Sequence, residues 1–118
     1  MDWIDASPHV VKDLEEAMDY VWGRLSVRGQ QEFREAVRDE LWHFHHGLGR
    51  ALRNELGLWE EVKPAVQIYF EDQLGVTHPD DISGIIIEAL HCRVHGVEFD
   101  LAAKVQHYKD YWSQKETP

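Results

Sequence analysis

Apolar residues recur at steps of three and four along most of this 118-residue chain, and this helical spacing constrains the fold more than any other feature. The longest stripe consists of Phe33, Val37, Leu41, Phe44, Leu48 and Leu52. No segment shows the alternation of apolar and polar residues that is typical of a strand, and the chain contains no internal repeat or linker. The sequence therefore predicts an all-α fold, a compact single-domain bundle of about five helices, with an ordered core over residues 7–112.

Capping residues and glycines predict where these helices begin and end. The expected helices run from Ser7 to Leu25, from Val27 or Gln30 to Leu56, from Glu60 or Glu61 to Gln73, from Thr77 to Gly96, and from Phe99 or Asp100 to Trp112. Ser7 precedes Pro8, which suits the first helical position, and Gly57 and Gly75 suit the position after a helix end.

Two of these helices have special features. The fourth is expected to be the central helix, because Ile85, Ile86 and Ile87 make it apolar on more than one side, and Thr77 with Asp80 resembles a capping box at its start. The second contains Gly47 and Gly49, and a helical glycine costs roughly 1 kcal/mol relative to alanine. It either continues, bends or breaks there. Residues 113–118 are expected to fray.

Composition excludes several classes of protein. The formal net charge of −10 disfavours a nucleic-acid partner and favours a basic protein partner, although acidity also serves solubility. The single cysteine, Cys92, cannot form an intramolecular disulfide. The N-terminus lacks a signal-peptide pattern, and the longest apolar run is only Ile85-Ile86-Ile87, so we expect a cytoplasmic protein of a bacterium with no membrane partner.

The stretch from His46 to Trp59 is the main candidate for a binding site. On a helical wheel the apolar side chains lie opposite a polar stripe of Asp39, His46, Arg50 and Arg53. Arginine suits such a surface because its guanidinium binds planar anions with two hydrogen bonds. The alternative is a solvated face in which Asn54 caps the helix end and Trp59 docks the third helix.

Two catalytic or metal-binding interpretations remain open. Arg38 and His43 are spaced as Arg-x-x-x-x-His, which resembles the catalytic signature of HEPN-type ribonucleases. This resemblance implies that both side chains act at the scissile phosphate. Glu88, His91 and His95 share one side of the fourth helix, as in metal-binding bundles, but a second Glu-x-x-His pair is absent. We expect neither a catalytic residue, nor a resident metal, nor a cofactor.

The chain also resembles a family of small uncharacterised bacterial and phage proteins, known only as a domain of unknown function. The matching motifs are His46-Gly47-Leu48-Gly49, Arg53-Asn54, Gly57-Leu58-Trp59 and His78-Pro79-Asp80-Asp81. This resemblance implies no activity, but it implies that the motifs belong to one unit. An ion pair between Arg53 and Asp80 would join them, and if buried it would specify one packing arrangement rather than add much stability.

The sequence therefore predicts a non-enzymatic protein-interaction module, of the immunity, antitoxin or regulatory kind, that acts on a basic partner. The expected binding residues are His46, Arg50, Arg53, Asn54, Trp59 and Asp80. The alternatives are the HEPN-like ribonuclease with Arg38 and His43 and the metal-binding helical bundle.

Overall fold

The fold is all-helical, as the apolar spacing predicts, and the chain forms a compact globule. The computed structural model describes residues 11–37, 41, 47–58 and 63–116. In this part of the chain there are α-helices and one π-helical turn but no strand. The elements are α1 (Leu14–Arg24), α2 (Val27–Glu35), α3 (Leu48–Glu55), α4 (Ala65–Tyr69) continued by η2 (Phe70–Leu74), α5 (Pro79–Val94) and α6 (Leu101–Glu116).

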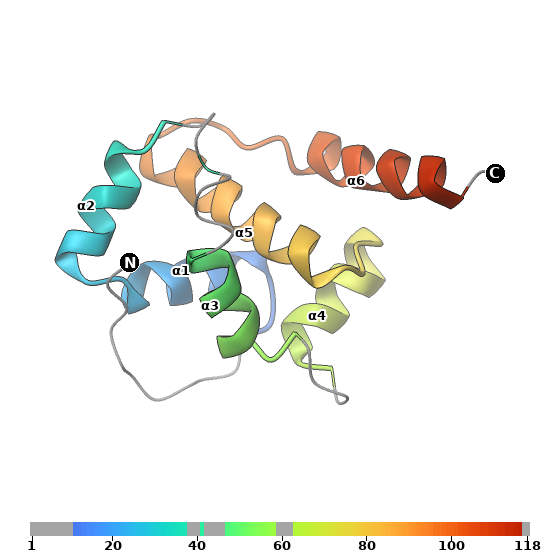
Figure 1. Cartoon of the computed structure of the whole chain (residues 1–118), viewed down its shortest axis with the longest axis horizontal. Coiled ribbons are helices and arrows are strands. Elements are labelled where there is room, and N and C mark those ends of the chain that lie inside the picture. The colour runs from blue at the N-terminus through green and yellow to red at the C-terminus, as the bar shows by residue number, and fades with distance from the viewer. Residues whose placement is uncertain (1–10, 38–40, 42–46, 59–62, 117–118) are drawn as a thin grey trace.

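Helix α5 is the centre of the molecule, as expected from its isoleucines. It contacts α1, α2, α3 and α6, and Figure 1 shows it between them. Ile82, Ile85 and Ile86 are fully buried and Ile87 is 1% exposed, so isoleucines on several sides of one helix reach different neighbours. Cys92 is also buried on this helix, where it packs as a small apolar residue.

The first helix begins later than predicted. Ser7 and Pro8 lie outside the described residues, but Val11 and Lys12 are not helical, and α1 begins at Leu14. The reason is Asp13, an extended residue whose side chain accepts a hydrogen bond from the Glu16 N–H at 2.9 Å. This N-cap satisfies an amide that a longer helix would have paired internally.

The long second helix does not exist as one element. Helix α2 ends at Glu35, because Ala36 adopts an extended conformation, and α3 begins only after Gly47. Val37, expected in the buried stripe, is 56% exposed. Of the other stripe residues, Phe33, Leu41, Leu48 and Leu52 are buried as predicted, and Phe44 lies outside the described residues. The apolar spacing was therefore correct about burial at these four positions but wrong about Val37 and about the continuity of the helix.

Two further helix starts were also wrong. Helix α4 begins at Ala65 with Pro64 as its N-cap, rather than near Glu60 with Pro64 inside the first turn. Helix α5 begins at Pro79, and its N-cap is His78 instead of Thr77. The His78 Nδ1 accepts the Asp80 N–H at 3.1 Å, so the imidazole replaces the predicted threonine hydroxyl and no Thr77–Asp80 capping box forms.

The predicted helix ends are confirmed. Gly57, Gly75 and Gly96 all have positive φ, which L residues with a side chain rarely adopt. After α3, the Leu58 N–H donates to the Arg53 carbonyl at 3.0 Å and the Gly57 N–H to the Asn54 carbonyl at 3.2 Å, which is the Schellman pattern.

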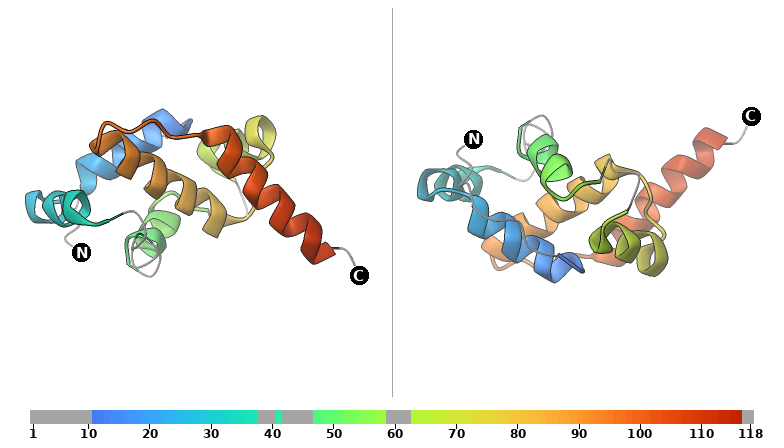
Figure 2. Two further views of the ribbon diagram at one scale, coloured as in Figure 1. Left: turned by 90° about the horizontal axis from the view of Figure 1, so that it is seen from above. Right: turned by 90° about the horizontal axis from the view of Figure 1, so that it is seen from below.

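Helix α6 begins at Leu101, just after the predicted start at Phe99 or Asp100, and continues past Trp112 to Glu116. The expectation that the chain frays from residue 113 is therefore wrong for residues 113–116, and residues 117–118 lie outside the described residues. The helix runs alongside the N-terminal half of α5 and then projects beyond the other helices (Figure 2). None of the described helices combines the length and apolar character needed to cross a bilayer.

Candidate functional site

Helices α3 and α5 meet at a polar junction formed by Arg53, Asp80 and Ser83. The Arg53 Nε lies 3.3 Å from the Asp80 Oδ1, and its Nη1 donates to the Ser83 hydroxyl at 3.1 Å. The Ser83 hydroxyl in turn donates to the Asp80 carbonyl at 3.0 Å. The predicted ion pair between the two motifs is therefore present. The Arg53 side chain is 12% exposed and that of Asp80 56%, so the pair is only half buried and fixes how α3 crosses the start of α5.

The remaining predicted binding residues do not gather at this junction. Arg50 and Asn54 are exposed on α3, while Arg53 is turned towards α5. His46 and Trp59 lie outside the described residues, as do Asp39 of the polar stripe and both residues of the ribonuclease interpretation, Arg38 and His43.

Next to the junction, the segment from Gly75 to Asp81 and helix α6 enclose two grooves separated by a ridge. The ridge consists of His78, Asp81, Tyr108 and Trp112, which line both grooves. The first, which we call the Lys109 groove, has a volume of about 480 Å³ and also includes Gly75 to Thr77, Pro79, Lys109 and Ser113. The second, the Tyr111 groove, has a volume of about 320 Å³ and also includes Asp80, His107 and Tyr111. Both are within the size range of small ligand sites.

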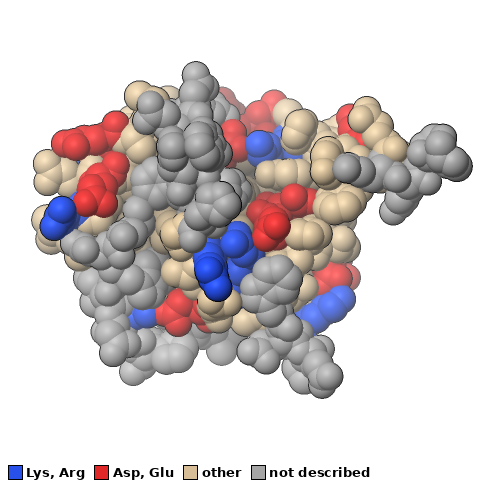
Figure 3. Space-filling model, in the orientation of Figure 1, with Lys and Arg blue, Asp and Glu red and all other residues tan. Residues whose placement is uncertain are grey.

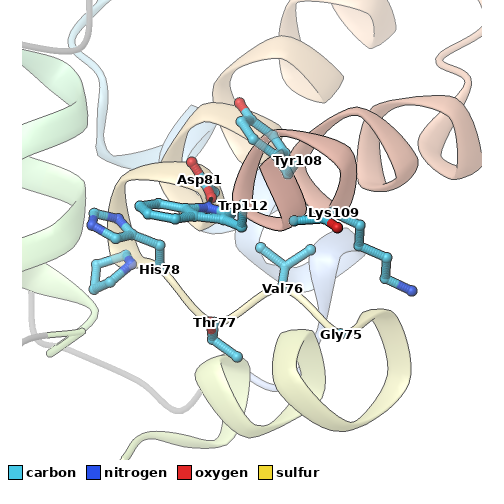
Figure 4. A pocket seen from close by; sticks show the side chains of 10 residues that line it. Gly75, Val76, Thr77, His78, Asp81, Tyr108, Lys109 and Trp112 are labelled. Atoms are coloured by element: carbon cyan, nitrogen blue, oxygen red, sulfur yellow. Dashed lines mark hydrogen bonds between the residues drawn. The ribbon is translucent and has the colours of Figure 1, made fainter. Parts of the chain in front are cut away.

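The ridge is held by direct contacts between α6 and the start of α5. The indole of Trp112 stacks on His78, with ring centroids 5.3 Å apart and an interplanar angle of 20°. Its Nε1–H donates to the Asp81 Oδ2 at 2.7 Å. In Figure 4 the indole lies between His78 and Asp81, while the Lys109 side chain points away from both. The N-cap histidine of α5 therefore has a second role as a platform for α6.

Tyr108 is the one residue of the ridge with a strongly shifted acidity. Burial raises the pKa of Tyr108 to about 12, and the negative charges of Asp81 and Glu88 add to the shift. Lys104 lies over its ring, 5.2 Å from the centroid, and pairs with Glu88 at 2.8 Å. At neutral pH the phenol is protonated, so Tyr108 adds no negative charge to that of Asp81.

Sequence analysis missed the contribution of α6 to this site. Trp112, the predicted last residue of the final helix, is 38% exposed, and Tyr111 beside it is 46% exposed. Two adjacent residues of a helix cannot both lie on its buried face. The neighbouring large aromatics Tyr111 and Trp112 were therefore the available sign of an exposed aromatic surface. That Trp112 meets the His78-Pro79-Asp80-Asp81 motif depends on tertiary packing.

The histidines of the metal interpretation have another role in this structure. The His91 Nε2 lies 2.6 Å from the carbonyl oxygen of Ala36, and the His95 Nε2 lies 2.8 Å from that of Arg34. Both rings thus form hydrogen bonds with carbonyl groups at the end of α2 that have no partner within the helix. Glu88 pairs with Lys104. Within the residues that the structure describes, no three His, Cys, Asp or Glu side chains are grouped as a metal site would need.

Comparison with known proteins places the chain in a family without assigning an activity. No curated protein and no solved structure matched the chain. The profile of a family described as a domain of unknown function (DUF6794) matches residues 12–94. This range covers α1 to α5 and ends at the last residue of α5, so α6 and the Trp112 side of the grooves lie outside it. The chain is therefore a member of the DUF6794 family, a domain of unknown function.

Proposed function

We propose that this protein is a non-enzymatic interaction module that binds a basic partner protein, in the manner of an immunity, antitoxin or regulatory protein. We further propose that it acts in the cytoplasm of a bacterium, and that the motifs from His46 to Trp59 and from His78 to Asp81 form one unit of the family. The expected role of Arg50, Asn54 and the half-exposed Asp80 is to border the contact surface.

The distribution of ion pairs is the observation that supports this proposal. The protein has 12 Lys and Arg against 22 Asp and Glu. Among the residues that the structure describes, six basic side chains are paired with carboxylates of the same chain. The pairs are Arg24 with Glu55, Arg28 with Glu32, Arg53 with Asp80, Lys63 with Glu71, Arg93 with Glu15 and Asp19, and Lys104 with Glu88. These six cations are thus neutralised within the chain, and the excess of carboxylates over basic residues in the sequence supplies the charge for a partner.

These carboxylates are spread over several helices. On the face drawn in Figure 3 the acidic side chains form several separate groups. Exposed examples include Asp72 on η2, Glu98 before α6 and Asp110 on α6. Separate acidic groups speed the encounter with a cationic protein, while the specific contact needs a shaped surface as well.

The test is binding of the purified chain to fluorescent peptides of matched length. One peptide carries arginines separated by glycine and serine, a second has citrulline in place of each arginine, and a third has glutamate. We expect fluorescence anisotropy to show binding of the arginine peptide alone, with an affinity that falls as the ionic strength rises towards about 0.15 M.

Two results would overturn the proposal. One is equal affinity for the arginine and citrulline peptides, and the other is an affinity unchanged by salt. The ribonuclease alternative is tested in the same preparation by incubation with a single-stranded RNA. Cleavage that is lost in both Arg38→Ala and His43→Ala, with folding intact, would replace the binding module by an enzyme.

A further inference from the structure

We propose that the Tyr111 groove binds an arginine side chain of a basic partner segment. This inference rests on the proposed function and assigns the partner's key residue and its binding site. The groove lies between the start of α5 and the outer half of α6, and its volume of about 320 Å³ is enough for a guanidinium and part of its alkyl chain.

The aromatic side chains of the groove suit a flat cation. Tyr111 and Trp112 are 46% and 38% exposed, and their rings meet edge to face with centroids 5.2 Å apart. Because His78 already stacks on the indole, a guanidinium would stack on Tyr111 and contact the part of Trp112 that remains exposed. Lys104 over the ring of Tyr108 shows that the neighbouring aromatic already accepts a cation.

Two carboxylates supply the charge. The Trp112 indole N–H holds the Asp81 Oδ2, which fixes the orientation of this carboxylate before a ligand arrives. Asp80 also lines the groove and is half exposed, with Arg53 3.3 Å from its Oδ1. A carboxylate has about four acceptor positions, so each of these groups can receive a further N–H while keeping its present contact. Arginine fits better than lysine because its planar fork combines stacking with paired hydrogen bonds.

The electrostatic environment favours this groove over its neighbour. No Lys or Arg is among the described residues that line the Tyr111 groove. Lys109 lines the other groove and points away from Asp81 (Figure 4). His78 accepts the Asp80 N–H through Nδ1, and only an unprotonated Nδ1 can accept, so His78 adds no positive charge here.

The experiment follows the indole N–H resonance of Trp112 by two-dimensional NMR of the full chain during titration with the arginine peptide. The citrulline peptide serves as the uncharged control. We expect the Trp112 indole signal and the amides of Asp81 and Tyr111 to shift with the arginine peptide, with much smaller shifts for the citrulline peptide.

Two variants measure the contribution of the groove. Asp81→Asn removes one charge and retains an oxygen that accepts the indole N–H, and Trp112→Leu removes the aromatic surface. Each variant is expected to lower the affinity for the arginine peptide by roughly 5- to 20-fold, because a charge-assisted contact or a cation–π contact is lost. Asp72→Asn, an exposed change of equal charge on η2, is the matched control and should weaken binding less than about 2-fold.

The outcomes separate this inference from the proposed function. If no basic peptide binds, both fail. If the arginine peptide binds but Asp81→Asn weakens it no more than Asp72→Asn, the module interpretation stands and the groove assignment is wrong. Shifts centred on α1 or α2 would likewise reject the groove. Since Trp112→Leu removes an anchor of α6, the helicity of this variant is compared with that of the wild type by circular dichroism. If Trp112→Leu loses helix, the groove assignment is decided by Asp81→Asn.

Discussion

Helices α5 and α6 have the same length of 16 residues but opposite relations to the rest of the molecule. Helix α5 is buried on nearly every side, and it touches most other helices. Among the α6 residues whose side chains the structure describes, Val105 alone is buried, and the helix extends past the body of the protein (Figure 2). The family profile covers all of α5 and none of α6.

This difference separates what makes the fold from what is attached to it. Burial of apolar surface holds α5 in place, so a loss of buried apolar surface on α5 would affect every neighbouring helix. Fewer apolar contacts hold α6, since Val105 is buried and Leu101 and Tyr108 pack against the core only in part. The stack of His78 on Trp112, the hydrogen bond from Trp112 to Asp81 and the Lys104–Glu88 pair add to them. A helix held in this way can form the wall of a groove without being essential to the core.

The largest expected effect is that of Ile86→Ala in α5. Ile86 is fully buried, so the substitution should lower the free energy of unfolding by about 2–5 kcal/mol, measured by urea denaturation. Val105→Ala in α6 should cost less, about 1–1.5 kcal/mol, because it removes two carbon atoms instead of three and does so at the edge of the core. Equal costs for the two variants would remove the distinction between the helices.

His91→Ala tests how α5 organises α2. The His91 ring bonds the Ala36 carbonyl and contacts the Phe33 ring edge to face, at a centroid distance of 5.7 Å. Loss of both contacts should cost about 1–3 kcal/mol and speed hydrogen exchange in α2 before other helices. The matched control is His107→Ala on exposed α6, expected to cost less than about 0.5 kcal/mol. If α2 exchange stays unchanged, the histidines do not hold that helix end.

The contact between α5 and the end of α2 also shows why the sequence predicted some features and missed others. The ends at Gly57, Gly75 and Gly96 were predictable, since a positive φ is a local demand on one residue. The end of α2 was not, because the groups that bond its last carbonyls come from α5, and His95 lies 61 residues after Arg34. Apolar spacing alone therefore predicted a helix that continues through Ala36.

The candidate site divides in the same way. The ion pair of Arg53 with Asp80 was predictable from two motifs that belong to one unit. The groove was not, because it forms where Trp112 of α6 meets His78, and neither helical spacing nor capping rules relate these residues. Even the cap was misassigned to Thr77, since the competing imidazole is fixed in place by that tertiary contact.

Asp81→Ala tests the attachment of α6 with a smaller effect. It removes the acceptor of the Trp112 indole N–H at a partly exposed site, so the global cost should be about 1 kcal/mol or less. Hydrogen exchange should rise in the second half of α6 and stay unchanged in the middle of α5. Gln114→Ala, an exposed change near the end of the same helix, is the control and should leave both unchanged. Faster exchange in α5 would show that the two helices unfold as one unit.

The smallest effect at neutral pH is expected for Tyr108→Phe, which becomes visible only in alkali. The pKa of Tyr108 in the folded protein is about 12, against 10.0 for an unperturbed phenol, chiefly because of burial. The folded state therefore favours the neutral phenol, and this contribution to stability is complete below pH 10 and is lost as the pH rises from 10 to about 12.

The measurement compares urea denaturation of the wild type and Tyr108→Phe across this interval. Below pH 10 the two should differ by less than about 0.5 kcal/mol. Above it the wild type should lose stability faster, because the phenylalanine cannot ionise. Tyr20 and Tyr69 also have raised pKa values from burial, but they are present in both proteins and cancel in the difference. Parallel stability curves through pH 12 would mean that α6 leaves Tyr108 open to solvent, and the edge helix would then be held even less firmly than the ridge contacts indicate.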